Sequence, residues 1–393
     1  MPRWAWVTLL ALAGCAVPHT PPAPPAPGTM LAPALRLIGV AEIPPGTEYG
    51  GTTLGGLSGI DYDAGRDEYL VISDARQPHV YTARLNYGAH GLATPQFTGV
   101  HALLHASGQR FAPWWRPRAD MDRPDAEAVR WLPGAQGFLW TSEGDFGHNF
   151  GRNFGPQLRQ ARADASPVRA LPLPESFTPA RKTGPRGNGT LEGLALSPDG
   201  QSAWLAMELP WKQDGDRATP TSAGAPVRIT QIDIASGRAL RQIAYAPDPV
   251  PRTRRLPGPQ VNGVSEILAD GPDHLLVLER DYSTGAGFGA RLYRIDTRAA
   301  SDTLALPALK PGNHRPAPKT LVADLAQLGL TPDNIEGMTW GAPLKEGAQG
   351  SGCVLVFVSD DNFNPAQVTQ FIAAEYLPPR AGHGRCGTNG APP

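Results

Sequence analysis

The stretch Asp333-Asn334-Ile335-Glu336-Gly337-Met338-Thr339-Trp340 is followed by the apolar run 353–358 and by Ser359-Asp360-Asp361-Asn362-Phe363. It reads as a strand with a carboxylate near its start, a loop, and a very apolar strand that ends in two aspartates. Short apolar runs bounded by turn residues are typical of buried strands. Earlier segments repeat this scheme, so we interpret the stretch as one copy of an internal repeat.

The same order of strand-like runs occurs in five copies, which begin near residues 57, 127, 192, 266 and 336. The period is therefore about 65 to 75 residues, enough for four strands and their loops. No stretch has a sustained helical period, which argues against a parallel α/β sheet. Four-stranded units repeated in series predict an all-β chain folded as a β-propeller.

We count five blades, and a sixth blade within the long loops stays open as an alternative. The last repeat has three strand-like runs, whereas the first run of the domain, Leu35–Ile43, has no partner beside it in the sequence. Placing this N-terminal strand in the last blade would close the ring and leave no open sheet edge.

The N-terminus is predicted to be a targeting segment. Residues 1–14 contain Arg3, an apolar run and Leu12-Ala13-Gly14 before Cys15. This run is too short to span a bilayer, and the small residues before a cysteine are typical of a bacterial lipoprotein signal peptide in which Cys15 is lipidated. The alternative is an ordinary secretory signal. We expect a lipid-anchored envelope protein, and Ala16 and Val17 after Cys15 favour the outer membrane, facing the periplasm.

Composition sets the remaining boundaries. Residues 15–33 are rich in proline and predict a stiff tether, residues 34–378 the propeller, and residues 379–393 a C-terminal tail. The 35 basic and 36 acidic residues give a net charge of -1, which argues against a nucleic-acid partner.

We expect a monomer. In an oxidising compartment Cys353 and Cys386 are expected to form a disulfide, with a redox pair as the alternative.

Acidic residues recur at one level of the predicted blades. If the register repeats, Glu127, Glu192, Glu266 and Glu336 form a ring near one mouth of the central channel. The second strand of each blade returns to the same mouth, which would bring further acids close: Asp74, Glu143, Asp145, Glu208, Glu279, Asp281, Asp360 and Asp361.

So many ionised carboxylates would repel one another unless positive charge is present. Oxygen ligands in this number suit Ca²⁺, which takes six to eight of them. Arg76, Arg130 and Arg280 lie beside the acids and are candidate structural partners or phosphate-binding groups. The alternative is that the acids cap loops or pair with arginine without any chemistry.

Four segments of the chain resemble the bacterial phytase-like family described as "esterase-like activity of phytase". They are 333–337, 359–363, Leu278-Glu279-Arg280-Asp281 and Thr190-Leu191-Glu192-Gly193. At the first repeat Ser58 stands in place of the acid. The resemblance implies a propeller and phosphomonoester hydrolysis of the calcium-dependent phytase kind, in which Ca²⁺ binds substrate phosphate and activates water. Calcium phytases have six blades, whereas the sequence predicts five here.

The leading hypothesis is a calcium-dependent hydrolase of phosphate esters or related esters, acting on a small anionic substrate. Predicted metal ligands are Glu127, Glu192, Glu266, Glu336 and Asp361. Arg280 and Arg76 are predicted to bind the substrate, and Glu208 or Glu279 to accept a proton from water. The rival hypotheses are a noncatalytic binding or scaffold propeller and a lactonase-like hydrolase.

Overall fold

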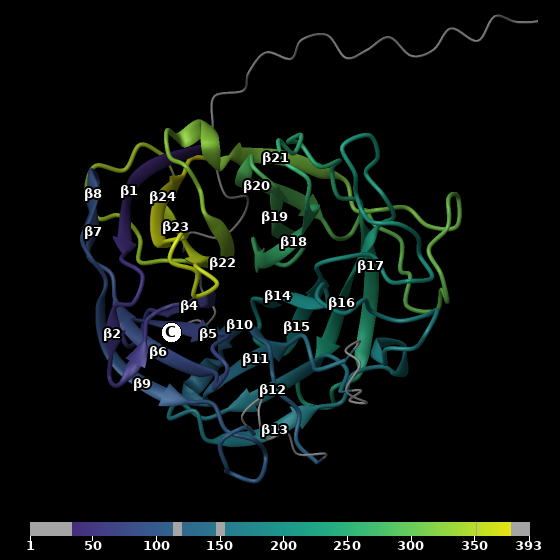
Figure 1. Cartoon of the computed structure of the whole chain (residues 1–393), viewed down its shortest axis with the longest axis horizontal. Helices are drawn as coiled ribbons and strands as arrows, with labels where there is room; N and C mark the ends of the chain where they lie inside the picture. Colours follow the sequence, from purple (N-terminus) through teal and green to yellow (C-terminus); the bar gives the residue numbers. More distant parts are fainter. Residues whose placement is uncertain (1–33, 113–119, 147–153, 351, 379–393) are drawn as a thin grey trace, which may run out of the picture. The chain divides into compact units, whose positions relative to one another are not determined.

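The structure, a computed structural model, describes residues 34–112, 120–146, 154–350 and 352–378. Five four-stranded antiparallel sheets surround a central axis, so the predicted all-β, five-bladed propeller is confirmed (Figure 1). Cys15, Cys386, the predicted signal peptide, the tether to residue 33 and the tail 379–393 lie outside the described residues.

Each blade has one strand at the axis and three that follow it outward (Figure 1). Blade 1 contains β4 (Leu57–Asp63), β5 (Glu68–Ser73), β6 (His79–Arg84) and β9 (Gln96–Ala102). Blade 2 contains β10 (Ala126–Trp131), β11 (Phe138–Ser142), β12 (Gln157–Ala161) and β13 (Pro167–Leu171). Blade 3 contains β14 (Leu191–Leu196), β15 (Ser202–Met207), β16 (Val227–Asp233) and β17 (Ala239–Tyr245).

Blade 4 contains β18 (Gln260–Ala269), β19 (His274–Ser283), β20 (Gly287–Asp296) and β21 (Lys319–Asp324). Blade 5 contains β22 (Asn334–Trp340), β23 (Cys353–Asp360), β24 (Thr369–Tyr376) and β1 (Leu35–Ile43). The other elements are the small hairpins β2 (Glu48–Tyr49)/β3 (Thr52–Thr53) and β7 (Tyr87–Gly88)/β8 (Gly91–Leu92), and the 3-10 turns η1 (Pro133–Ala135), η2 (Glu175–Phe177) and η3 (Leu325–Leu328). Among the described residues no helical segment is long and apolar enough to cross a membrane.

Strand β1 closes the ring as the sequence predicts. It pairs antiparallel with β24, from Leu35 opposite Tyr376 to Ile43 opposite Thr369. Arg36 forms a salt bridge of 2.8 Å with Glu375 on that partner strand. In the same blade Cys353 is disulfide-bonded. Its pairing with Cys386 stays a prediction, because that residue lies outside the described part of the chain.

The core lies between neighbouring blades. Both faces of a blade are covered, so strands such as β15 and β23 are buried along their whole length and read as continuous apolar runs. Ile60 and Val71 of blade 1, for example, belong to the same buried cluster as Val356 and Phe371 of blade 5. Burial of an aliphatic or Phe side chain stabilises the fold by about 1.5–3 kcal/mol.

A β-bulge occurs at the same level in every blade. The pairing between the first and second strands shifts at Leu57/Gly59, Ala126/Val129, Leu191/Gly193, Val264/Glu266 and Ile335/Gly337. A bulge inserts one unpaired residue and re-aims side chains locally. The residues in these shifts include Ser58, Glu127, Glu192, Ser265 and Glu336. The repeated bulge thus brings a polar side chain to the same place in each blade.

Candidate active site

Two rings of equivalent positions surround one mouth of the channel. We call the bulge residues the inner ring: Ser58, Glu127, Glu192, Ser265 and Glu336. The outer ring consists of one residue from the second strand of each blade, at or near the end of that strand that lies beside the start of the first strand. These residues are Asp74, Glu143, Glu208, Arg280 and Asp360. Its members lie opposite the residue two positions before the bulge residue of the first strand, as the pairs Arg280/Gly263 and Asp360/Asn334 show.

The backbone fixes the outer ring in the other three blades. The N–H groups of Asp74, Glu143 and Glu208 donate to the carbonyls of Gly56, Asp125 and Thr190, at 2.9, 2.9 and 2.7 Å. In each case the hydrogen bond extends the ladder of the first two strands by one step. The carboxylates therefore occupy equivalent places, and Arg280 is the only cation in the two rings.

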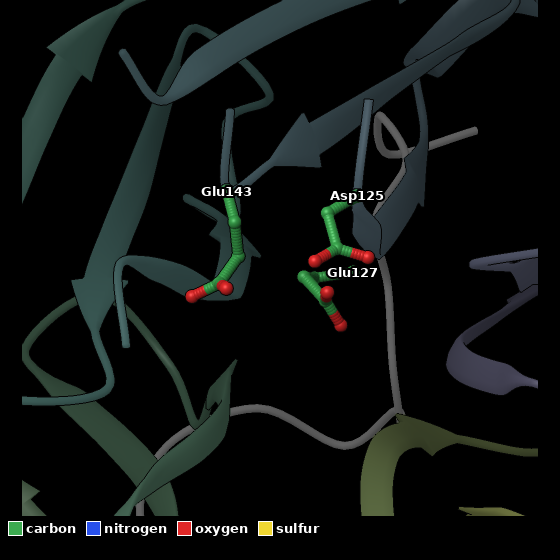
Figure 2. Close-up of side chains that lie close together, drawn as sticks. All are labelled: Asp125, Glu127 and Glu143. Atoms are coloured by element: carbon green, nitrogen blue, oxygen red, sulfur yellow. The ribbon is translucent and has the colours of Figure 1, made fainter. Parts of the chain in front are cut away.

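One group of carboxylates lies in blade 2. Asp125, Glu127 and Glu143 each offer an oxygen, and these oxygens lie within 4.8 Å of one another (Figure 2). Asp125 and Glu127 come from the first strand and its approach, and Glu143 from the end of the second. Glu143 also accepts hydrogen bonds from the N–H groups of Gly189 and Thr190 in the neighbouring blade. Three carboxylates at this separation form a candidate cation site.

A second group lies where blade 5 meets blade 1. Asp361 accepts hydrogen bonds from the N–H groups of Gly56 (2.9 Å) and Phe363 (3.0 Å). Asp74 is close by, since a Cβ at Gly56 would lie 2.0 Å from its Oδ1. This Oδ1 is buried and has no hydrogen-bond donor among the described residues. A buried carboxylate oxygen without a donor is costly unless a cation satisfies it.

Arg280 connects blades 3, 4 and 5. Its Nη2 lies 3.0 Å from Glu208 Oε1 and 3.5 Å from Glu336 Oε1. Burial alone would lower the pKa of Arg280, but Glu208, Glu336 and Glu192 raise it above its ordinary value. A single guanidinium thus offsets part of the negative charge of the mouth.

The remaining charge shifts the carboxyl pKa values upward. Burial, with Asp125 and Glu208 nearby, raises the pKa of Glu143 to about 8. Burial and Asp360 raise that of Glu336 to about 8, and burial raises that of Asp360 to about 6. Burial and neighbouring carboxylates raise the pKa values of Glu127 and Glu192 as well. Without added positive charge, the mouth therefore retains protons that isolated carboxyls lose.

The donor set fits a calcium ion. All candidate ligands are carboxylate oxygens, with the amide of Asn334 hydrogen-bonded to Glu336 at 2.9 Å. Calcium binds hard oxygen ligands in irregular geometries, and it would satisfy the donor-free Oδ1 of Asp74. Groups with raised pKa values release protons when a cation binds, which couples binding to pH.

Glu266 lies in a layer beneath the rings instead of in the inner ring. Its Oε2 pairs with Arg130 Nη2 at 2.8 Å, and its Oε1 accepts hydrogen bonds from the N–H groups of Leu194 and Ile267. The bulge of β18 places Ser265 at the inner-ring position. The sequence alignment of the repeats placed Glu266 there, so the prediction is wrong by one residue in blade 4. Glu266 is thus already held by one ion pair and two backbone hydrogen bonds.

Arg130 fills the channel in this layer and is 0 % exposed. Its two terminal nitrogens donate to carbonyls of four first strands: Ile60 in β4, Val129 in β10, Ile267 in β18 and Met338 in β22. Glu266 links the same layer to β14 through Leu194. All five first strands therefore meet in one hydrogen-bonded layer next to the two rings.

Glu279 faces away from the mouth. Glu279 directly precedes Arg280 in β19 and pairs with Val264. Because successive residues of a strand point to opposite faces, its side chain points away from that of Arg280. Its carboxylate accepts hydrogen bonds from Asn262 at 2.7 Å and Lys319 at 2.8 Å. Glu279 is thus held in a network with outer strands of blade 4. Two other acids expected near the ring, Asp145 and Asp281, form salt bridges with Arg123 and Arg252.

The structure therefore brings together Glu127, Glu192, Glu208, Glu336, Asp361 and Arg280 of the predicted site. Arg76 lies beside the mouth, in the wall of a separate cavity. Asp125 was not among the predicted ligands. Its position two residues before Glu127, and hence on the same side of an extended strand, is the signal that would have indicated it.

The family described as "Phytase-like: Esterase-like activity of phytase" matches residues 52–363, and the chain belongs to this family. No curated protein sequence matches the chain.

Two solved structures with low identity have similar chain traces. Kuenenia stuttgartiensis hydrazine synthase has 11 % identity and a TM-score of 0.34, covering 82 % of each chain. A GH43 β-1,3-galactosidase with galactodeoxynojirimycin has 12 % identity and a TM-score of 0.42, covering 84 % of this chain and 94 % of the other. At these scores the likenesses carry no argument about activity.

Proposed function

We propose that this protein is a calcium-dependent hydrolase of phosphate esters, or of closely related esters, anchored in the cell envelope through Cys15. The observation that carries the proposal is the mouth of the channel: two rings crowded with carboxylates and containing one guanidinium, Arg280. Membership of the phytase-like family supports hydrolysis of this kind. The anchor and the envelope location rest on the N-terminal sequence alone.

Carboxylates of blades 2, 3 and 5 are the proposed calcium ligands. Asp125, Glu127 and Glu143 would hold calcium in blade 2. Glu192, Glu336 and Asp361, from blades 3 and 5, would be further ligands. Bound calcium would offset the charge of the substrate phosphate and lower the pKa of an attacking water.

Arg280 and Glu208 act on the substrate and on water. The guanidinium of Arg280 donates hydrogen bonds in a planar fork, which suits a phosphoryl oxygen. Glu208, 3.0 Å from Arg280, stands where it would accept the proton of the attacking water. Neither inner-ring serine is bonded to a base: the hydroxyl of Ser265 donates to the carbonyl of Ile335, and that of Ser58 to Gly56. The geometry thus favours direct attack by water over a covalent serine intermediate.

A binding or scaffold propeller is the second candidate, favoured by the layer of Arg130 and Glu266. There, charged channel residues hold the blades together without any ligand. Calcium at the mouth would then reinforce the ring and carry out no chemistry.

The test is hydrolysis of an aryl phosphate and an aryl carboxylate ester by the purified protein, with calcium and with a chelator. We expect turnover that requires calcium and is lost in Glu336→Gln. The matched control is Glu346→Gln, an exposed carboxylate in the loop after β22. Calcium-dependent melting without turnover of either ester would instead support the scaffold. Membrane release by Cys15→Ser, followed by fractionation, tests the anchor.

A further inference from the structure

Blade 4 extends past the acidic mouth. Its first strand, β18, has five residues before the inner-ring position Ser265, whereas the first strands of the other blades have one or two residues before theirs. Strands β19 and β20 follow β18 over this whole length, as far as the pairs Gln260/Ser283 and Ser283/Gly287. At about 3.3 Å per residue, the additional residues add about 10–13 Å. Blade 4 therefore projects beyond the two rings on the mouth side.

The end of the projection is formed by the loop 252–259 and the turn 284–286, which together we call the blade 4 tip. The backbone N–H groups of Arg255 and Leu256 donate to the carbonyl of Thr284 at 2.9 and 3.2 Å. In return, the N–H of Thr284 donates to the last carbonyl of the loop at 3.1 Å. The loop is thus fixed on the end of the strand ladder, and the tip presents a defined surface.

Leu256 is the apolar part of this surface. Its side chain is 60 % exposed, more than any other large hydrophobic side chain in the described part of the chain. A Cβ at Gly285 in the turn would lie 3.0 Å from Leu256 Cγ, so the turn supports the side chain from below. A single exposed leucine is ordinary on a protein surface. This one is distinguished by its place at the end of a rigid projection and by its charged neighbours.

The tip is also cationic. Its loop contains three arginines and no acidic residue. Arg252 pairs with Asp281 at 2.9 Å, which offsets its charge. Arg254 and Arg255 are exposed, and neither forms an ion pair within the residues that the structure describes, although Arg254 donates to a carbonyl of the loop at 2.8 Å. Two guanidinium groups whose charge is not offset by an acid thus stand beside Leu256.

These two properties together fit an anionic lipid surface. Arginines close to an anionic bilayer are attracted to its headgroups, and an apolar side chain beside them gains free energy by entering the boundary between headgroups and acyl chains. An acidic protein or polysaccharide would attract the arginines equally well. It would leave Leu256 in water unless it also supplied an apolar pocket for that side chain. A bilayer satisfies both parts of the tip without a matching pocket.

We propose that the blade 4 tip docks on the surface of an anionic lipid bilayer, with Leu256 at the boundary between headgroups and acyl chains and with Arg254 and Arg255 on lipid phosphates. The tip lies on the mouth side of the ring, so docking turns the mouth toward the bilayer. This inference goes beyond the proposed function and is independent of it, because it uses none of the candidate calcium ligands and none of the residues assigned to hydrolysis.

The test is partition of the protein onto vesicles of phosphatidylcholine with and without phosphatidylglycerol, measured by flotation. Residues 33–393 are used, because they cluster as one unit that contains all five blades. They lack the apolar N-terminal segment and Cys15, which would bind vesicles by themselves. A chelator is present throughout, so that calcium does not bridge the mouth and the lipid. We expect binding that requires phosphatidylglycerol and weakens as salt is added.

The tip variants separate the apolar part from the charge. Leu256→Ala should weaken binding to the anionic vesicles about five- to tenfold, whereas Leu256→Phe should keep it. Arg254→Ala with Arg255→Ala should weaken it about 30-fold, or about fivefold for each charge. All of these side chains are exposed, so the melting temperature should not change.

Matched control substitutions lie at the opposite end of the blades. Leu240→Ala removes a side chain that is 37 % exposed near the start of β17. Arg84→Ala with Arg238→Ala removes two exposed positive charges, one at the end of β6 and one in the turn before β17. These variants have the same change in charge or apolar surface as the tip variants, and we expect them to bind like the unsubstituted protein.

The outcomes distinguish lipid docking from other roles of the tip. Weaker binding in both tip variants, with the controls unchanged, supports the proposal whether or not any ester is hydrolysed. Weaker binding in the arginine variant alone would show that the tip recognises only charge, as on an acidic protein or polysaccharide, and would overturn the docking of Leu256 in lipid. Weaker binding in the leucine variant alone, equal binding to vesicles without phosphatidylglycerol, or equal binding by all variants would also overturn the proposal.

Discussion

Arg280 Nη2 lies 3.0 Å from Glu208 Oε1, and Arg280 takes the place that Asp74, Glu143, Glu208 and Asp360 take in the other four blades. In the outer ring the repeat thus places an acid in four blades and departs from this pattern once, at Arg280. That departure provides the mouth with a fixed donor beside a carboxylate that is able to accept a proton. The site depends on both the repetition and the exception.

Replacing Arg280 by Lys should lower kcat by about 10²-fold, the loss typical of removing one preorganised donor from a transition state. A lysine keeps the charge but loses the planar fork. Because Glu208 keeps a cationic partner, the fold should survive, and the melting temperature checks this. Steady-state kinetics on an aryl phosphate measure the effect, and an unchanged kcat would remove Arg280 from the mechanism.

Replacing Arg130 by Met should destabilise the protein by about 3–5 kcal/mol, because Glu266 would remain buried without a cationic partner. Urea unfolding measures the loss. Substituting Glu266→Leu in the same chain should recover part of it, since no buried charge would then remain. The control is Arg66→Met, whose partly exposed pair with Asp63 should be worth about 0–1 kcal/mol. Equal effects of the two single substitutions would contradict a structural layer in the channel.

Chelated protein should lose stability as the pH rises from 5 to 9. Glu143 and Glu336 have folded-state pKa values of about 8 against an ordinary 4.5, so the folded state binds more protons than the unfolded state between these values. Stability must then fall with rising pH in this window. Calcium should flatten the dependence, because it replaces the protons. Urea midpoints at several pH values measure it, and a midpoint that rises with pH in the chelated protein would oppose the assignment.

Gly56→Ala should weaken calcium binding more than Gly46→Ala. Both glycines have positive φ, +58° and +76°, so the backbone strain is comparable. A Cβ at Gly56 would meet Asp74 Oδ1 at 2.0 Å, whereas one at Gly46 has nothing within 4 Å. Calcium titration of both variants isolates the displacement of Asp74 from the strain. Equal affinities would show that Asp74 does not contribute to the cation site.

The fold and most of the site were accessible from the sequence because rotational repetition turns equal spacing along the chain into proximity at the axis. The five starts of the repeat gave the blades, and Glu127, Glu192 and Glu336 fell where predicted. Glu266 did not, because the bulge in β18 places Ser265 at the ring position. A bulge shifts which residue is unpaired without changing the apolar pattern, so periodicity alone cannot locate it.

Glu279 shows the same limit in the second strand. The run Glu279-Arg280-Asp281 has charge at three successive positions, and only the facing register tells which one points to the channel. Asp125 escaped prediction for another reason. It lies directly before the first residue of β10, and its proximity to Glu143 depends on a contact between strands.

The pairing of β1 with β24 has a consequence for biosynthesis. The first strand of the domain to leave the ribosome has its partner among the last, so the ring cannot be completed until almost the whole chain has been made. Until then β1 presents an unsatisfied edge, and blade 5 is incomplete. A chain that ends before Thr369 would lack β24, so β1 would have no partner strand and the ring of blades would stay open. We expect such products to be recognised as unfolded instead of accumulating as shortened propellers.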